Sequence, residues 1–383
     1  MAIVQLPYCP KEMLMIYLDN GSTTKIDSQV LQVLTENLQN NYYNPSSIHG
    51  GGLTVLELLK QAKKTMIEAL SWQGDFLFTS GGTEANNLAI LGTVKPKTHI
   101  ITTKSEHPSV LRTIDSLKTK GITVSYIGFL ENGQINIEDL SKQLSENPQT
   151  SLVSIMNTNN ETGNRQDTKK IGQVIKNNCD ALYHTDCVAA FGKHALNTEN
   201  VDMLTVSSHK IHGPGGVGGL YVKRGINLRP QFFGGHQQNG KRPGTEFSTG
   251  QIAFAKATQI ANENLEKNKE HVSQLWDKFK NLVLLHTPDA VINTSDFHSP
   301  YVLNISFPKT KGQVVVNALS DRSVYCSAGA ACNERSTNQL KELGYPKEIY
   351  ETAIRFSFSR YNTIEEIEIA SEKLKEVLKL LRR

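Results

Sequence analysis

The 383-residue sequence contains few cysteines and lacks a paired cysteine motif. The five cysteines are Cys9, Cys179, Cys187, Cys326 and Cys332, and none of them forms a C-x-x-C pair. An odd number without such a pair argues against both a disulfide framework and a zinc ribbon. At least one thiol is therefore expected to be free.

Long hydrophobic runs and dense blocks of one charge are also missing. The apolar runs are much shorter than a membrane-spanning helix, and the N-terminus has no basic region followed by an apolar core. The net charge is only +4, and no dense Lys/Arg block occurs before Arg382 and Arg383. We therefore expect a cytoplasmic protein with no membrane segment and no direct nucleic-acid partner.

The remaining composition is that of a globular protein, and short apolar runs alternate with segments of helical periodicity. The expected strands cover residues 75–79, 99–102, 124–127, 152–156, 181–184 and 201–206. The expected helices between them cover residues 83–91, 109–120, 137–145 and 168–177. This alternation predicts an α/β fold with a mostly parallel sheet flanked by helices. Ligands of such sheets bind beyond the carboxyl ends of the strands.

The pattern changes after Gly250. A long helical stretch from Gln251 to Phe279 is followed by short strands and helices, and an amphipathic helix from Thr363 to Leu381 closes the chain. We predict a large domain over residues 16–258 and a small α+β domain over residues 259–383, joined by the N-terminal segment.

A lysine follows the strand expected over residues 201–206. Held against apolar walls, Lys210 could lose its proton and form a Schiff base with a carbonyl cofactor. Ser207 and His209 flank it as potential phosphate donors. Residues 213–218 match G-x-G-x-x-G, but a strand-like run follows instead of a helix, which argues against a dinucleotide site.

Other strand ends carry the remaining parts of a cofactor site. Gly82 and Thr83 open a helix whose first N–H groups suit a phosphate. His107 could stack on a flat ring, and Asp186 could keep a pyridine nitrogen protonated. Together with Lys210, these groups are what pyridoxal phosphate requires.

Zinc is the weaker alternative. His209 and His212, or His184 and Asp186, have a spacing that could bind a metal. No cysteine or further histidine joins them at metal-site spacing, so we expect no metal.

The C-terminal part adds two candidate residues. Cys332 lies in a run of very small residues, 327–333, whose composition suits an exposed, mobile loop; a buried, inert cysteine is the alternative. Arg355 lies in an apolar strand, where an arginine is costly unless it meets a carboxylate.

Nine motifs resemble those of a known family. They are Tyr17-Leu18-Asp19-Asn20, Asn44-Pro45-Ser46-Ser47-x-His49, Thr79-Ser80-Gly81-Gly82-Thr83-Glu84-x-Asn86-Asn87, Glu106-His107, Asn159-Asn160-Glu161-x-Gly163, Ser208-His209-Lys210, Arg242-Pro243-Gly244-Thr245, Ser327-x-Gly329-x-Ala331-Cys332 and Ile354-Arg355-Phe356-Ser357. On these motifs, which run from Tyr17 to near the final helix, the chain resembles the cysteine desulfurases, fold type I pyridoxal-phosphate (PLP) enzymes of the class V aminotransferase group.

The resemblance implies that L-cysteine condenses with the cofactor, a thiolate attacks its sulfur, and L-alanine leaves. Lys210 would be the Schiff-base lysine, His107 the stacking acid/base, Asp186 the pyridinium partner, and Cys332 the nucleophile that becomes a persulfide. The resemblance also implies binding roles for Gly82, Thr83, Ser207, His209 and the other subunit's Thr245 at the phosphate, Asn159 at the cofactor ring, and Asn44 with Arg355 at the substrate carboxylate. A homodimer and a sulfur-acceptor protein are the implied partners.

Two departures from the family pattern accompany the resemblance. Ala189 replaces a glutamine that donates to the cofactor's phenolic oxygen, and the segment between Cys332 and Arg355 is a few residues shorter than in members with a long cysteine loop. Selenocysteine lyase and a cofactor-binding sulfur-assembly scaffold with weak turnover remain alternative functions. The acceptor is also open, because iron–sulfur cluster assembly and tRNA thiolation start from the same persulfide.

Overall fold

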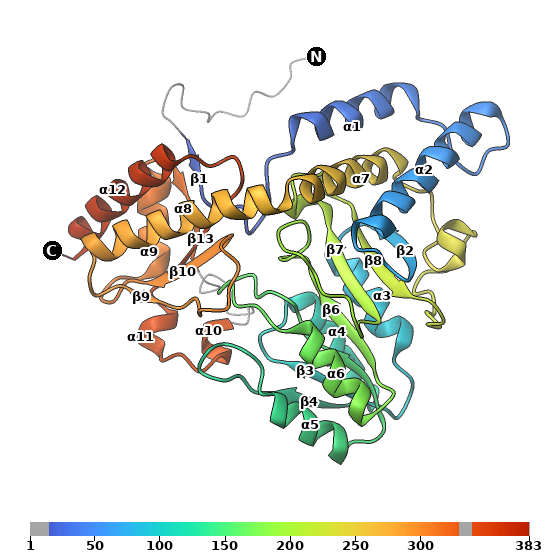
Figure 1. Cartoon of the computed structure of the whole chain (residues 1–383), viewed down its shortest axis with the longest axis horizontal. Coiled ribbons are helices and arrows are strands. Elements are labelled where there is room, and N and C mark those ends of the chain that lie inside the picture. The colour runs from blue at the N-terminus through green and yellow to red at the C-terminus, as the bar shows by residue number, and fades with distance from the viewer. Residues whose placement is uncertain (1–14, 329–338, 383) are drawn as a thin grey trace.

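The computed structural model describes residues 15–328 and 339–382, and its largest sheet has seven strands (Figure 1). In spatial order they are β2 (Gly74–Thr79), β8 (Gly218–Lys223), β7 (Met203–Ser207), β6 (Leu182–Asp186), β5 (Thr150–Ser154), β3 (His99–Thr103) and β4 (Thr123–Ile127). Only β8 runs antiparallel to its neighbours in this sheet. This confirms the predicted α/β fold with a mostly parallel sheet.

Helices cover both faces of this sheet because successive side chains of a strand point to opposite sides. In β7, Leu204 and Val206 join one hydrophobic core and Met203 joins the other. The core that contains Met203 is closed by α3 (Gly82–Thr93) and α4 (Pro108–Lys118). The opposite core is closed by α1 (Ser28–Asn40), α2 (Gly50–Ala69), α5 (Ile137–Glu146), α6 (Thr168–Asn178) and α7 (Ser248–Glu263). None of the described helices is long and apolar enough to span a lipid bilayer.

A separate hydrophobic core lies in the C-terminal part of the chain. Its antiparallel sheet has the order β12 (Ser327–Ala328), β13 (Ala353–Ser357), β10 (Val302–Ser306) and β9 (Val291–Ile292). The helices of this part are α8 (Leu265–His286), α9 (Gly312–Ser320), α10 (Gln339–Glu342), α11 (Lys347–Tyr350) and α12 (Ile364–Leu381).

The N-terminal segment packs into this C-terminal core. Strand β1 (Ile16–Tyr17) pairs in parallel with β11 (Val324–Tyr325), and Ile16 and Leu18 are fully buried in the same core. In Figure 1 the blue β1 accordingly lies among orange and red elements.

The stretch predicted to be helical from Gln251 to Phe279 is helical, but it does not form one long helix, because the chain breaks at Asn264 into α7 and α8. The Asn264 side chain donates to the Ile260 carbonyl at 3.0 Å, a local bond that competes with a continuous helix. Helix α7 packs on α1 and α2, whereas α8 packs on α12. We propose Asn264 as the border between a large and a small domain, since residue 258 lies inside α7.

Candidate functional site

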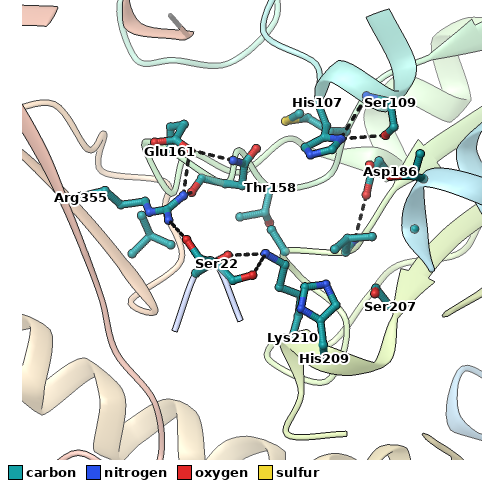
Figure 2. Close-up of a pocket in the computed structure, with 18 of the residues that line it drawn as sticks. Ser22, His107, Ser109, Thr158, Glu161, Asp186, Ser207, His209, Lys210 and Arg355 are labelled. Carbon is teal, nitrogen blue, oxygen red and sulfur yellow. Dashed lines mark hydrogen bonds and ion pairs between the residues drawn. The ribbon is translucent and has the colours of Figure 1, made fainter. Parts of the chain in front are cut away.

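A cavity of about 520 Å³ opens at the carboxyl ends of the parallel strands (Figure 2). Most of the predicted site residues line it, namely Gly82, Thr83, His107, Asp186, Ser207, His209, Lys210 and Arg355. They come from the last residues of β6 and β7, from segments that follow β2, β3 and β7, and from β13 of the small sheet. The structure therefore brings together in one cavity the side chains that the sequence placed at the ends of strands.

Lys210 ends a short 3-10 helix, η1 (Ser208–Lys210), that directly follows β7. Its Nζ donates to the carbonyl oxygens of Gly21 and Ser22, the latter at 2.6 Å. The N-terminal turn is itself anchored here, since the Thr24 hydroxyl donates to the His209 carbonyl at 2.9 Å. Burial, followed by the charge of Arg355, lowers the pKa of Lys210 to about 8. About a tenth of the amine is thus neutral at pH 7, far more than for a solvated lysine.

The beginning of α3 supplies N–H groups to the cavity. Its N-cap, Gly81, makes no side-chain capping bond, so the first N–H groups of the helix have no side-chain acceptor there. A Cβ on Gly82 would lie only 2.8 Å from a Val188 methyl carbon, so the close packing requires glycine. Ser207 and His209 line the same cavity, and burial, with Lys210, lowers the pKa of His209 to about 4. These donors suit an anion.

A hydrogen-bonded chain connects Asp186 with His107. The Asn86 amide donates both to Asp186 Oδ2 at 2.7 Å and to the Ser109 hydroxyl at 2.8 Å. His107 Nδ1 lies 2.7 Å from that hydroxyl and accepts the Ser109 N–H at 3.1 Å. Because Nδ1 is an acceptor, the neutral ring carries its proton on Nε2. Burial lowers the pKa of His107, so the neutral form is favoured.

Arg355 reaches the cavity from β13 and is paired with two carboxylates. Its two terminal nitrogens donate to Asp19 Oδ1 and Glu161 Oε1, each at 2.8 Å. Burial alone would lower the pKa of Arg355, but Glu161 and Asp19 outweigh it and raise that pKa. The predicted need for a carboxylate partner is thus met by the protein itself.

Three predicted site residues in the described part of the chain, Asn44, Asn159 and Thr245, do not line this cavity. Asn159 turns its side-chain oxygen to the N–H groups of Glu161 and Thr162, both at 2.9 Å. Thr245 and Asn44 lie on the surface, and the Asn44 side chain accepts the Ser46 N–H at 2.9 Å. Cys332 lies outside the described residues.

The structure also reveals cavity residues that the sequence interpretation missed. They are Gly21, Ser22, Asn86, Ser109, Asn160, Glu161 and Lys193. Asn86 and Glu161 belong to quoted motifs, so their positions carried a signal, whereas Lys193 follows the Asp186 segment without any motif. Lys193 is only 8% exposed, and burial, followed by Lys210 and Arg355, lowers its pKa to about 7. Ala189 lines the cavity as well.

The histidines considered as zinc ligands make other contacts. His184 lies in the core between the Ser154 and Thr205 hydroxyls, at 2.9 and 3.0 Å, and His212 contacts the Lys25 carbonyl at 2.8 Å. Among the described residues, no three or more His, Cys, Asp or Glu side chains cluster as metal ligands would.

Comparison with known proteins gives one consistent result. The model of the class-V aminotransferase family matches residues 16–369. A cysteine desulfurase from Nostoc sp. is 37% identical over 380 residues, covering 97% of this chain and 94% of its own length.

Solved structures agree with this match. A NifS-like protein superposes with a TM-score of 0.90 at 33% identity, covering 96% of this chain and all of its own. The structure described as SspA in complex with cysteine has a TM-score of 0.78 at 28% identity, covering 91% of this chain and all of its own. The resemblance found in the sequence is confirmed, and the chain belongs to the class-V aminotransferase family, within the group that contains the cysteine desulfurases.

Proposed function

We propose that this protein is a PLP-dependent cysteine desulfurase that converts L-cysteine to L-alanine and leaves the sulfur as a persulfide on Cys332. The observation that carries this proposal is the meeting of the Lys210 amine, the Asp186 carboxylate and the N-terminus of α3 in one cavity. A sulfur-acceptor protein would then take the sulfur in the cytoplasm.

The cavity residues fit PLP in both size and chemistry. A volume of about 520 Å³ lies within the range of small-molecule and cofactor sites. The first N–H groups of α3, with Thr83, Ser207 and His209, would hold the phosphate. Asp186, oriented by Asn86 and by the Val188 N–H at 2.9 Å, would pair with the ring nitrogen.

Bound PLP supplies a carbonyl that captures amines and a protonated ring that withdraws electrons. Lys210 would offer its neutral amine to that carbonyl and would serve as a proton carrier at the substrate. His107 would stack over the ring, and in its neutral form it holds a proton on Nε2 that it can donate. Arg355 holds the substrate carboxylate, and the Cys332 thiolate accepts the sulfur.

The proposal is tested by incubating the purified, PLP-loaded protein with L-cysteine and a thiol reductant. Alanine and sulfide should appear in equal amounts. Cofactor binding without either product would contradict the proposed activity.

Loading of the apoprotein with PLP should accelerate as the pH rises towards 8. Only the neutral Lys210 amine attacks an aldehyde, and the pKa of Lys210 is about 8 because burial favours that neutral form. The rate should therefore rise roughly tenfold per pH unit below 8 and level off above it. Stopped-flow absorbance after mixing with PLP measures this rate. A rise that continues to pH 10, as for a solvated lysine, would contradict the low pKa.

The protein is also proposed to be a homodimer, in which Thr245 and Asn44 serve the neighbouring subunit's site. Both lie on the surface near very exposed apolar side chains, since Ile48 is 94% and Phe233 91% exposed. The loops that carry them border the same surface hollow, which Ser46 and Glu246 both line. An apolar surface of this kind suits a protein interface.

Thr245→Ala should weaken PLP binding by roughly 10- to 100-fold, the effect of losing a hydrogen bond to a charged group. Fluorescence titration of the apoprotein measures this affinity. Mixed dimers of Thr245→Ala with Lys210→Ala should regain one intact site and part of the activity. A fully active monomer in sedimentation experiments would exclude the shared site.

A further inference from the structure

The terminal nitrogens of Arg355 have no free hydrogen-bond donor for a substrate. One donates to Glu161 Oε1 at 2.8 Å and to the Asn160 carbonyl at 3.2 Å. The other donates to Asp19 Oδ1 at 2.8 Å and to the Ser22 hydroxyl at 2.6 Å. A guanidinium has only five N–H donors, four of them on these two nitrogens. A substrate carboxylate can therefore form a bidentate pair with Arg355 only if one of these four partners leaves.

The charges around Arg355 lead to the same conclusion. One guanidinium with a 5% exposed side chain faces two carboxylates, so these three groups sum to one negative charge. A third carboxylate added to this cluster would be repelled, and like charges in contact cost much affinity. The Arg355 Nε is buried and has no partner among the described residues, but a single N–H cannot form a two-pronged pair.

Of the two carboxylates, Glu161 is the one that can be exchanged. Asp19 also accepts from Ser22 and Ser327, at 2.9 and 2.8 Å, and its backbone bridges to β13. Glu161 lines the cavity whereas Asp19 does not. Within the described part of the chain, the Glu161 carboxylate receives one side-chain bond besides those of Arg355, from Asn160 at 3.0 Å. The Glu161 backbone is held by Asn159, so its side chain can swing away without moving the loop.

We propose that Glu161 is a specificity-determining residue that occupies Arg355 in the substrate-free site and is exchanged for the substrate carboxylate. The proposal rests on the substrate role of Arg355 given above. Its consequence is selection by charge: a zwitterionic amino acid brings an ammonium group that offsets the Glu161 charge, whereas a simple carboxylate brings none. Glu161 thus disfavours carboxylates that lack an amine.

The test uses the PLP-loaded protein and 3-mercaptopropionate, which carries a thiol and a carboxylate but no amine. Calorimetric titration should show that Glu161→Gln binds it about tenfold more tightly than the parent protein, because one like charge is removed. Glu161→Ala should act in the same direction. In both variants the affinity for L-alanine should rise less than the affinity for 3-mercaptopropionate. Asp27→Asn is the matched control. Asp27 pairs with Arg360 at 2.6 Å and does not line this cavity, so this variant should bind 3-mercaptopropionate with the parental affinity.

Unchanged or weaker binding by folded Glu161 variants would overturn the proposal. A crystal structure of the wild-type protein with 3-mercaptopropionate provides a test that needs no variant. The proposal predicts that Glu161 has left Arg355, and it fails if the ligand carboxylate and Glu161 contact Arg355 together. If the protein produces alanine and sulfide while Glu161 stays bound to Arg355 in the ligand complex, the exchange is refuted but the proposed function is not. If Glu161 leaves Arg355 but the protein produces neither alanine nor sulfide, the proposed function is refuted but the exchange is not.

Discussion

Replacing Lys210 with alanine should reduce desulfuration on the order of 10³-fold or more, because both the amine that captures the cofactor and a proton carrier are lost. The cavity would keep its other groups: the N-terminus of α3, Asp186 and His107. Lys210→Ala should therefore still bind PLP, but without a covalent link. Absorbance spectra and mass spectrometry after borohydride reduction distinguish the two forms of binding.

The matched control for this result is the second buried lysine of the cavity. Lys193 is also removed from solvent, and burial lowers its pKa to about 7, so it is the other amine that could react with an aldehyde. Borohydride should fix the cofactor to the peptide containing Lys210 in both the parent protein and Lys193→Met. Label on another lysine of the parent protein would contradict the assignment.

The second large effect is expected from cysteine substitutions. Cys332→Ser should bind PLP and L-cysteine but release no sulfide, since a hydroxyl cannot replace the sulfur-accepting thiolate. Cys326→Ser should retain nearly the parental rate. Cys326 is only 8% exposed, and burial, followed by Asp19, raises the pKa of its thiol far above neutrality. A thiol in that state is a poor nucleophile.

Sulfide and alanine release measured side by side distinguish the two cysteines. The persulfide on Cys332 should be detectable by mass spectrometry in the parent protein and in Cys326→Ser. Desulfuration by Cys332→Ser at the parental rate would show that another group accepts the sulfur.

The sequence predicted the large sheet and one edge of the site well, for a physical reason. Short apolar runs that alternate with helical periods specify parallel strands, and their carboxyl ends necessarily lie together. Asp186, Lys210 and His107 each follow such a run, so their convergence did not depend on long-range information.

Contacts between distant segments were not predictable in this way. Nothing local indicates that the carbonyl oxygens of Gly21 and Ser22 receive the Lys210 amine, or that Asp19 and Glu161 share Arg355. Hydrogen bonds within a single turn also limited what could be predicted from the sequence. The Asn159 side chain satisfies two N–H groups of its own turn, and no pattern in the sequence distinguishes it from its neighbour Asn160, which does line the cavity.

The position of β1 in the C-terminal core has a consequence for the order in which the protein is assembled during its synthesis. Chains leave the ribosome N-terminus first, and their units fold as they are completed. The sheet that presents Lys210 can form once α7 has emerged, but Ile16 must wait for its partner Val324. The Asp19–Arg355 pair joins residues 336 positions apart, so it can form only after β13 has emerged. We expect a nascent chain to acquire its cofactor-binding half well before it can hold an amino-acid carboxylate.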